Sequence, residues 1–146
     1  MSESLLHRYY PTETARFFDP MKIGSSAKAA DAGAELILTG TKFTTSSAPW
    51  HYPDGRVPFR GALSLLLDGA DRPRAIVETT RVEPRAFANI DADFAWGYGE
   101  GDRTLDGWRR EMGAWYRAEA ARLGARFSDD MVILCEWIRV ARRFAV

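Results

Sequence analysis

The sequence is poor in the residues that usually build metal and redox sites. It contains one cysteine, Cys135, which excludes an intrachain disulfide and a zinc site made of several cysteines. Its two histidines, His7 and His51, lie far apart in the sequence, which disfavours a histidine metal site. We therefore expect neither a metal nor a cofactor.

Net charge and long apolar runs are also missing. Twenty acidic and twenty basic residues cancel, which argues against strong non-specific binding to duplex nucleic acid, because that binding needs many neutralised phosphates. No apolar run reaches eighteen residues, so we expect no membrane span. Residues 1–10 lack the basic start and apolar stretch of a signal peptide. A cytoplasmic protein is the expectation.

The 146 residues predict a single domain, 1–146, with 46% apolar residues to build its core. Breakers and caps predict helices at residues 3–9, 26–38, 91–98 and 104–123, an irregular segment at 12–24, and strands at 61–68, 74–82 and 130–144. Because strands and helices do not alternate regularly, the fold class is α+β rather than a doubly wound sheet.

Lysine is rare as well, and one of the three lysines stands in a distinctive hexad, Gly40-Thr41-Lys42-Phe43-Thr44-Thr45. Burial can lower the pKa of a lysine enough for it to exchange protons, which arginine effectively cannot do. Lys42 and Thr45 are three residues apart, so a turn would bring both side chains to one side. The alternative is a lysine that only meets the C-terminal dipole of the preceding helix.

A second candidate is Glu78, in the middle of a predicted strand, where carboxylates are disfavoured. If it points inward it needs a cationic or hydrogen-bonding partner, because a buried unpaired charge is costly. We predict Lys42 as that partner. The alternative is a glutamate on the outer face of the strand.

Two further segments could contact a ligand. Glu100 and Asp102, in a glycine-rich stretch, could bind a ribose hydroxyl, a base edge or a cation, or Asp102 could only cap the next helix. Trp50 and Tyr52 flank a proline-rich loop and could stack on a base, although packing of the loop would explain them equally well.

Four segments taken together resemble the ASCH domain family, which is related to the PUA domain. They are the hexad at 40–45, Leu67-Asp68-Gly69 followed by Val77-Glu78-Thr79-Thr80, Gly99-Glu100-Gly101-Asp102 through Trp108-Arg109, and Asp130-Met131-Val132 leading into Cys135-Glu136. The resemblance covers about residues 24–142, and residues 1–23 precede it as a short helix and an irregular segment.

The resemblance implies a small PUA-like β-barrel with flanking helices and a central cleft. Family members are thought to bind RNA or nucleotides, some small relatives hydrolyse N4-acylated cytidines, and others are described as ribonucleases. The functional trio of the hydrolase-like relatives matches Lys42, Thr45 and Glu78. Ligand contacts are then expected from the matching segments and the loop: Gly40, Thr44, Trp50, Tyr52, Glu100, Asp102, Trp108 and Arg109.

The chain departs from the family pattern at two positions. Tyr98 stands where many longer relatives carry a glutamate, and Met112 where many carry a histidine. The departures leave the trio intact and point to a different substrate. Two hypotheses follow: a metal-independent hydrolase acting on an N-acylated cytidine or on RNA, and a non-catalytic module that binds RNA or a nucleotide. The sequence leaves the oligomeric state open.

Overall fold

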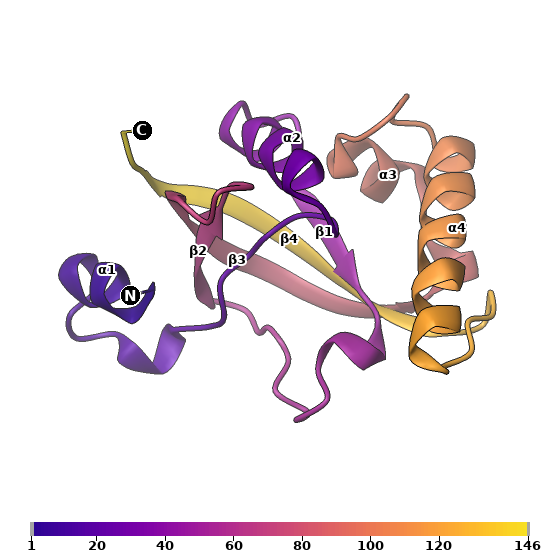
Figure 1. The fold of residues 1–146 in the computed structure, drawn as a ribbon, viewed down its shortest axis with the longest axis horizontal. Helices are drawn as coiled ribbons and strands as arrows, with labels where there is room; N and C mark the ends of the chain where they lie inside the picture. The colour runs from indigo at the N-terminus through magenta and orange to yellow at the C-terminus, as the bar shows by residue number, and fades with distance from the viewer. Residues whose placement is uncertain (1, 146) are drawn as a thin grey trace.

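An antiparallel sheet of four strands forms the centre of the fold, which we describe from a computed structural model of residues 2–145. The strand order is β1-β4-β3-β2. The strands are β1 (Thr44–Ser47), β2 (Leu63–Leu67), β3 (Pro73–Ala86) and β4 (Val132–Arg143). The long strands β3 and β4 run across the molecule as a ribbon, and the short strands flank it (Figure 1).

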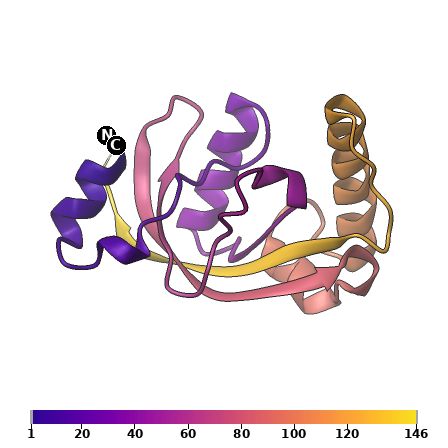
Figure 2. The same cartoon turned by 90° about the horizontal axis from the view of Figure 1, so that it is seen from below.

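Within residues 2–145, four α-helices and three short 3-10 helices surround this sheet. The helix α2 lies over the middle of the ribbon, while α1 and α4 lie at opposite ends (Figures 1 and 2). The bounds of the helices are α1 (Ser2–Tyr9), η1 (Thr14–Arg16), α2 (Ala27–Leu38), η2 (Pro49–His51), η3 (Phe87–Asn89), α3 (Ala92–Tyr98) and α4 (Leu105–Leu123). The α+β class is therefore confirmed.

The sheet is open, so the expected barrel is wrong. The strand β1 pairs with residues 134–137 of β4, near its beginning. The strand β2 pairs with residues 73–78 of β3, which lie opposite the other end of β4, at 139–143. The two edge strands thus sit on opposite sides and at opposite ends of the ribbon, and with four and five residues they are too short to meet.

Alternation along the strands gives the sheet two faces with different partners. On one face Ala75, Val77 and Ile138 pack against Ala34 and Ile37 of α2. On the other face Leu63, Leu65 and Ile76 pack against Leu6 of α1 and Phe17. A third apolar cluster, built on Phe87, Phe94, Trp108, Tyr116 and Cys135, joins α3 and α4 to the sheet.

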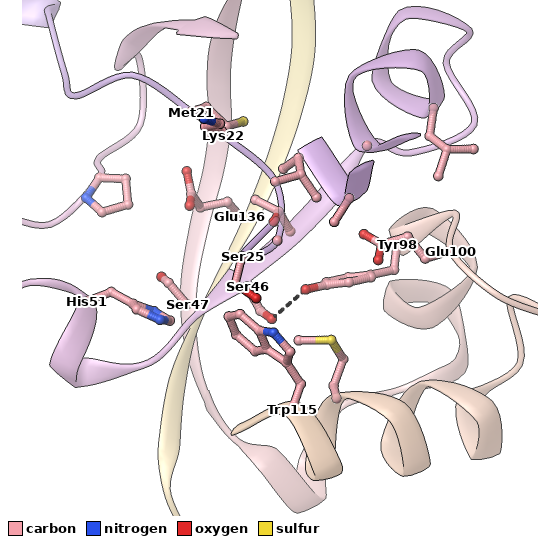
Figure 3. Close-up of a pocket in the computed structure, with 18 of the residues that line it drawn as sticks. Met21, Lys22, Ser25, Ser46, Ser47, His51, Tyr98, Glu100, Trp115 and Glu136 are labelled. Carbon is pink, nitrogen blue, oxygen red and sulfur yellow. Dashed lines mark hydrogen bonds between the residues drawn. The ribbon is translucent and has the colours of Figure 1, made fainter. Parts of the chain in front are cut away.

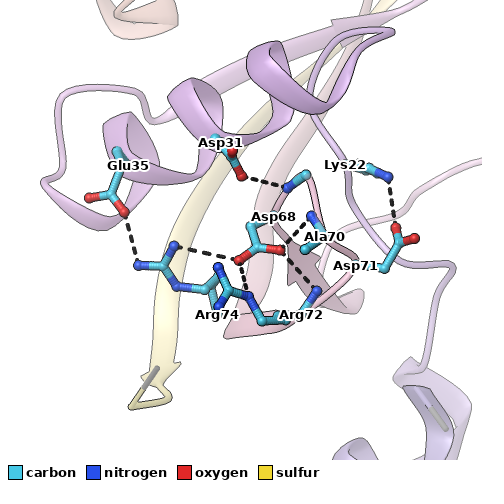
Figure 4. Close-up of polar contacts among 9 residues, drawn as sticks. Lys22, Asp31, Glu35, Asp68, Ala70, Asp71, Arg72 and Arg74 are labelled. Carbon is cyan, nitrogen blue, oxygen red and sulfur yellow. Dashed lines mark hydrogen bonds and ion pairs between the residues drawn. The ribbon is translucent and has the colours of Figure 1, made fainter.

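The turn between β2 and β3 holds the N-terminal half of α2 in place (Figure 4). The carboxylate of Asp68 is buried and accepts bonds from the backbone N–H groups of Ala70 and Arg72, both at 2.9 Å. These bonds hold the pKa of Asp68 below its ordinary value. From α2, Asp31 accepts a 2.7 Å bond from the N–H of Gly69, and Glu35 pairs with Arg74. Helix and hairpin are therefore tied by polar contacts as well as by the core.

Capping residues fix the ends of the helices close to where the sequence predicts them. The side chains of Ser26, Asp91 and Thr104 accept N-terminal backbone hydrogen bonds, and α4 ends at Gly124 in a left-handed conformation. The buried face of α2 consists of Ala30, Gly33, Ala34 and Ile37. Within residues 2–145, no helix is both long and apolar enough to cross a bilayer.

Candidate functional site

A cleft of about 890 Å³ opens between α2, β1, the middle of β4 and the middle of α4. Glu100 and Tyr98 lie at one side of it and His51 at the other, with Ser46 and Glu136 between them (Figure 3). Residues 18–25 complete the wall. The cleft thus lies over the edge strand β1, which begins within the hexad.

The chain path after α2 directs the Lys42 side chain inward. Gly40 takes a positive φ of 78°, and the N–H of Lys42 bonds back to the carbonyl of Leu36 at 2.9 Å. The next residue, Phe43, bonds to the carbonyl of Gly97 in α3 and accepts from the N–H of Ile138 in β4. These bonds fix the segment between α3 and the sheet before β1 begins at Thr44.

Lys42 is fully enclosed, with its side chain 0% exposed. Its Nζ forms an ion pair with Glu100 Oε2 at 2.7 Å and donates to the carbonyl of Tyr98 at 3.2 Å. The ammonium also lies 3.4 Å from the centre of the Tyr98 ring. Burial lowers the pKa of Lys42 from 10.5 to about 8, and Glu100 opposes that shift. The dipole that Lys42 meets belongs to the end of α3, not to the preceding helix.

Tyr98 connects this ion pair to the hydroxyl groups of β1. Its hydroxyl lies 3.1 Å from Ser46 Oγ. Ser46 Oγ lies 2.7 Å from the hydroxyl of Tyr116. Burial raises the pKa of Tyr98 above its ordinary value, so it stays a neutral phenol. Lys42, Tyr98 and Ser46 therefore form one continuous contact chain, and Tyr98, Ser46 and the adjacent Thr45 line the cleft.

The predicted pairing of Lys42 with Glu78 is wrong. Glu78 bonds to Arg16 at 2.8 Å and to Arg139 at 2.6 Å, and it does not line the cleft. The reason is the alternation of β3: Ile76 and Glu78 share the face that packs against α1, whereas Val77 and Thr79 share the α2 face. The carboxylate beside Lys42 is Glu100, which the sequence had marked only as a possible ligand contact.

A second carboxyl in the cleft was missed. Glu136 lies in the middle of β4, is 5% exposed, and accepts a 3.1 Å bond from Thr79 Oγ1. Burial raises its pKa from 4.5 to about 7. The signal was the one used for Glu78, a glutamate in the middle of a predicted strand, and here apolar residues, Cys135 and Trp137, flank it on both sides.

At the far side of the cleft, Glu119 is fixed by two aromatic donors. Its Oε1 accepts bonds from Trp50 Nε1 and from His51 Nε2. The other ring nitrogen of His51, Nδ1, accepts the backbone N–H of Ala48, so Nε2 carries the proton. This arrangement holds η2 against α4 and leaves His51 without a free basic nitrogen. Trp50 is engaged here rather than lining the cleft, whereas Tyr52 lines it and donates to Ser47.

The remaining predicted ligand contacts lie around the cleft rather than in it. Gly40 is exposed beyond α2, and Thr44 is fully buried with its hydroxyl on the carbonyl of Phe94. Asp102 accepts bonds from Thr104, the residue that caps α4. Trp108 belongs to the core, and Arg109 donates to the carbonyls of Ala88 and Ile90. Most of these predicted ligand contacts therefore make local structural contacts instead of lining the cleft.

Acidic groups outnumber basic ones in the wall of the cleft. The basic members are Lys22 and His51. The acidic members are Asp19, Glu100, Glu111, Glu119 and Glu136. Among residues 2–145, no three His, Cys, Asp or Glu side chains gather closely enough to hold a metal ion. Such a wall attracts hydrogen-bond donors and neutral polar groups more than a run of phosphates.

Comparison with known proteins identifies the family. The profile of the ASCH domain matches residues 19–142, most of the chain. The chain belongs to the ASCH domain family. The solved ASCH domain from Lactobacillus crispatus JV V101 superposes with a TM-score of 0.84 at 25% identity, covering 97% of this chain and 94% of that one. The protein EF3133 from Enterococcus faecalis V583 gives a TM-score of 0.83 at 25% identity, with coverage of 97% and 85%.

These ASCH structures share the open α+β architecture described above. No curated protein matches the chain. ASCH domains generally resemble RNA-binding domains. Membership of the family therefore indicates RNA-related binding, without identifying a ligand. The chemistry at the cleft has to be argued from its own residues.

Proposed function

We propose that this ASCH domain binds a modified nucleoside in its cleft and hydrolyses an amide on the base, of the N4-acylated cytidine type. The observation that carries the proposal is the enclosed Lys42 ammonium, which holds Glu100 at 2.7 Å at one side of the cleft. A carboxylate beside a lysine with a pKa of about 8 suits proton transfer near neutral pH.

In the proposed reaction the hydroxyl of Thr45, or a water beside it, attacks the acyl carbon of the amide. Glu100, which forms an ion pair with Lys42, accepts the proton of the attacking hydroxyl. The C–N bond then breaks, and the proton passes to the departing amino nitrogen of the base. If Thr45 is the nucleophile, a water hydrolyses the acyl-threonine in a second step with the same proton acceptor. The products are a carboxylic acid and the unmodified nucleoside.

The charge of the cleft favours a nucleoside over a long RNA strand. Three of its carboxylates have cationic neighbours: Asp19 has Arg56, Glu100 has Lys42, and Glu119 has Arg122. These neighbours are already engaged, so no free cluster of cations is left in the wall for a phosphate backbone. Binding of single-stranded RNA should therefore be weak and should depend only slightly on salt.

A substrate panel tests the proposal. N4-acylated cytidines, an N6-acylated adenosine and single-stranded RNA are incubated with the protein, and products are separated by liquid chromatography. We expect release of cytidine from the N4-acylated substrates and no RNA cleavage. Thr45→Ala should slow the release at least about 100-fold, since it removes the attacking or positioning hydroxyl.

Thr45→Ser is the matched variant, because it keeps the hydroxyl and removes only a methyl group. Retained activity in Thr45→Ser together with loss in Thr45→Ala supports a role for the hydroxyl itself. Cleavage of RNA that survives a chelator, with no release of cytidine, would replace the proposal by a ribonuclease. Tight, salt-dependent RNA binding without any turnover would favour the non-catalytic module.

A further inference from the structure

Glu136 stands directly beside the proposed reaction centre. In the pairing of β1 with β4 it is the residue opposite Thr45. Directly opposite residues of an antiparallel pair point to the same face, with Cβ atoms about 5 Å apart. Both side chains line the cleft, and Figure 3 shows Glu136 above Ser47 and Ser46 in the wall of the cleft. A ligand group that reaches Thr45 therefore also reaches the Glu136 carboxyl.

The carboxyl of Glu136 has unused hydrogen-bonding capacity. Thr79 donates to its Oε1 at 3.1 Å. Among the residues that the structure describes, no other group hydrogen-bonds to it, so Oε2 remains available to a ligand. The strands around it are already paired, since Val82 of β3 is its neighbour on the other side. The carboxyl is thus held by the sheet and aimed at the cleft.

Its surroundings leave this carboxyl about half protonated at pH 7. Burial raises the pKa of Glu136 to about 7. The titratable group that lines the cleft with it is Tyr52, and its strand neighbour Cys135 points to the opposite face, into the apolar cluster. Burial raises the pKa values of both to about 12, so both are neutral. On β3, Arg81 and Glu83 pair with each other, and Arg81 lies over Trp137 on the opposite face. The other charged groups of the wall have partners of their own: Lys22 pairs with Asp71, Asp19 with Arg56, and Glu100 with Lys42.

We propose that Glu136 is the specificity-determining residue of the cleft and pairs with an edge of a nucleobase that offers a donor and an acceptor side by side. The N4–H and N3 of an N4-acylated cytosine form such an edge. A neutral carboxyl offers one O–H donor and one acceptor, which matches it. The acyl carbon is bonded to the same N4, so this pairing presents it to the neighbouring Thr45. The proposal rests on the function proposed above and names what selects its substrate.

The ionised carboxylate would select a different edge. Two carboxylate oxygens both accept, so they match an edge with two adjacent donors, such as N1–H and N2–H of guanine. Raising the pH through about 7 should therefore weaken cytidine-type ligands and strengthen guanosine-type ligands. Opposite pH trends for the two nucleosides are a signature that a purely structural glutamate would not produce.

The experiment measures the affinity of cytidine, N4-acetylcytidine and guanosine by titration calorimetry at pH 6 and pH 8.5. Because a group with a pKa of about 7 changes from mostly neutral to mostly ionised over this range, the wild type should bind cytidine at least about fivefold more tightly at pH 6. Glu136→Gln keeps a donor and an acceptor but does not titrate, so it should bind cytidine equally at both values.

Glu136→Ala should weaken cytidine binding at pH 6 at least about tenfold, and Asp106→Asn, an exposed acid on α4 outside the cleft, should leave it unchanged. Circular dichroism confirms that each variant is folded. Wild-type affinity in Glu136→Ala, or pH dependence that persists in Glu136→Gln, would overturn the inference.

Turnover of N4-acetylcytidine, measured in parallel, separates this inference from the proposed function. If the protein binds cytidine with the expected pH dependence but releases no cytidine from any amide, the proposed hydrolase activity is contradicted and the proposed role of Glu136 is supported. If it hydrolyses the amide and neither Glu136 variant changes KM, the proposed role of Glu136 is contradicted and the proposed hydrolase activity is supported.

Discussion

Replacing Lys42 by methionine should reduce the release of cytidine at least about 100-fold, the usual contribution of a positioned proton-transfer group. The reason is that Glu100 loses the ammonium 2.7 Å away that holds it in position. The protein should nevertheless fold, because methionine fills most of the same enclosed volume without a charge to desolvate. Initial rates at saturating substrate and thermal unfolding, measured on the same preparations, check both parts.

The pH dependence of the free energy of unfolding should also differ between the wild type and Lys42→Met. Since burial, only partly opposed by Glu100, lowers the pKa from 10.5 to about 8, the charged form costs the folded state roughly 3 kcal/mol net of its contacts. The unfolded state therefore binds more protons between those values, and the wild type should gain stability as pH rises from 8 to 10.5. Lys42→Met should lack that gain. Urea unfolding at both pH values measures it.

Two variants sharpen the interpretation of Lys42. Lys42→Arg keeps a positive charge that cannot be given up, so it should be as inactive as Lys42→Met if the lysine takes part in proton transfer. Lys28→Met removes an exposed lysine of α2 and should leave turnover unchanged. Wild-type turnover in Lys42→Met would contradict the proposed chemistry outright, and wild-type turnover in Lys42→Arg would reduce the role of Lys42 to a fixed charge.

Replacing Gly99 by alanine should lower the free energy of unfolding by about 3 kcal/mol or more. Gly99 ends α3 with a φ of 71°, a left-handed conformation that costs a residue with a Cβ about 1–2 kcal/mol. A Cβ would also lie 2.5 Å from the carbonyl oxygen of Thr41 and 2.8 Å from Cα of Lys42. Those are backbone atoms, so relief would require the Lys42 segment to move away from α3. Urea unfolding gives the change.

Gly124 provides the matched control for Gly99. It ends α4 with a φ of 69°, but nothing lies within 4 Å of the position that its Cβ would take. Gly124→Ala should therefore cost only the conformational part, about 1–2 kcal/mol. Equal losses in the two variants would show that the close approach of α3 to the Lys42 segment contributes nothing to stability.

The helices of this fold are encoded locally, which is why they could be predicted. Ser26, Asp91 and Thr104 cap helices whose starts were expected within one or two residues, and Gly124 ends α4 as expected. Closure of the sheet is not a local property. It depends on which parts of β3 and β4 the short strands pair with, and the observed registers keep β1 and β2 apart. A family resemblance suggested a barrel that these registers do not form.

The sequence predicted the hexad as part of the site, but it did not predict which residues contact the hexad. The rarity of lysine and the turn after α2 pointed to Lys42, which lies beside the cleft as a buried cation. Its partner, Glu100, is 58 positions away and is brought close only because α3 packs on the end of the hexad. Glu78 and Glu136 looked alike in the sequence, as glutamates inside strands. Which of the two faces the cleft follows from the packing of α2 and α1 on opposite faces, and strand alternation alone does not determine it.

The most direct test of the central claim is a side-by-side measurement of cytidine release by Glu100→Gln and Glu78→Gln. Both changes remove one negative charge and keep the shape of the side chain. If Glu100 works with Lys42 at the cleft, Glu100→Gln should lose at least about 100-fold in rate, while Glu78→Gln, whose carboxylate bonds Arg16 and Arg139 away from the cleft, should stay within about threefold of the wild type. Full activity in Glu100→Gln with loss in Glu78→Gln would contradict the account.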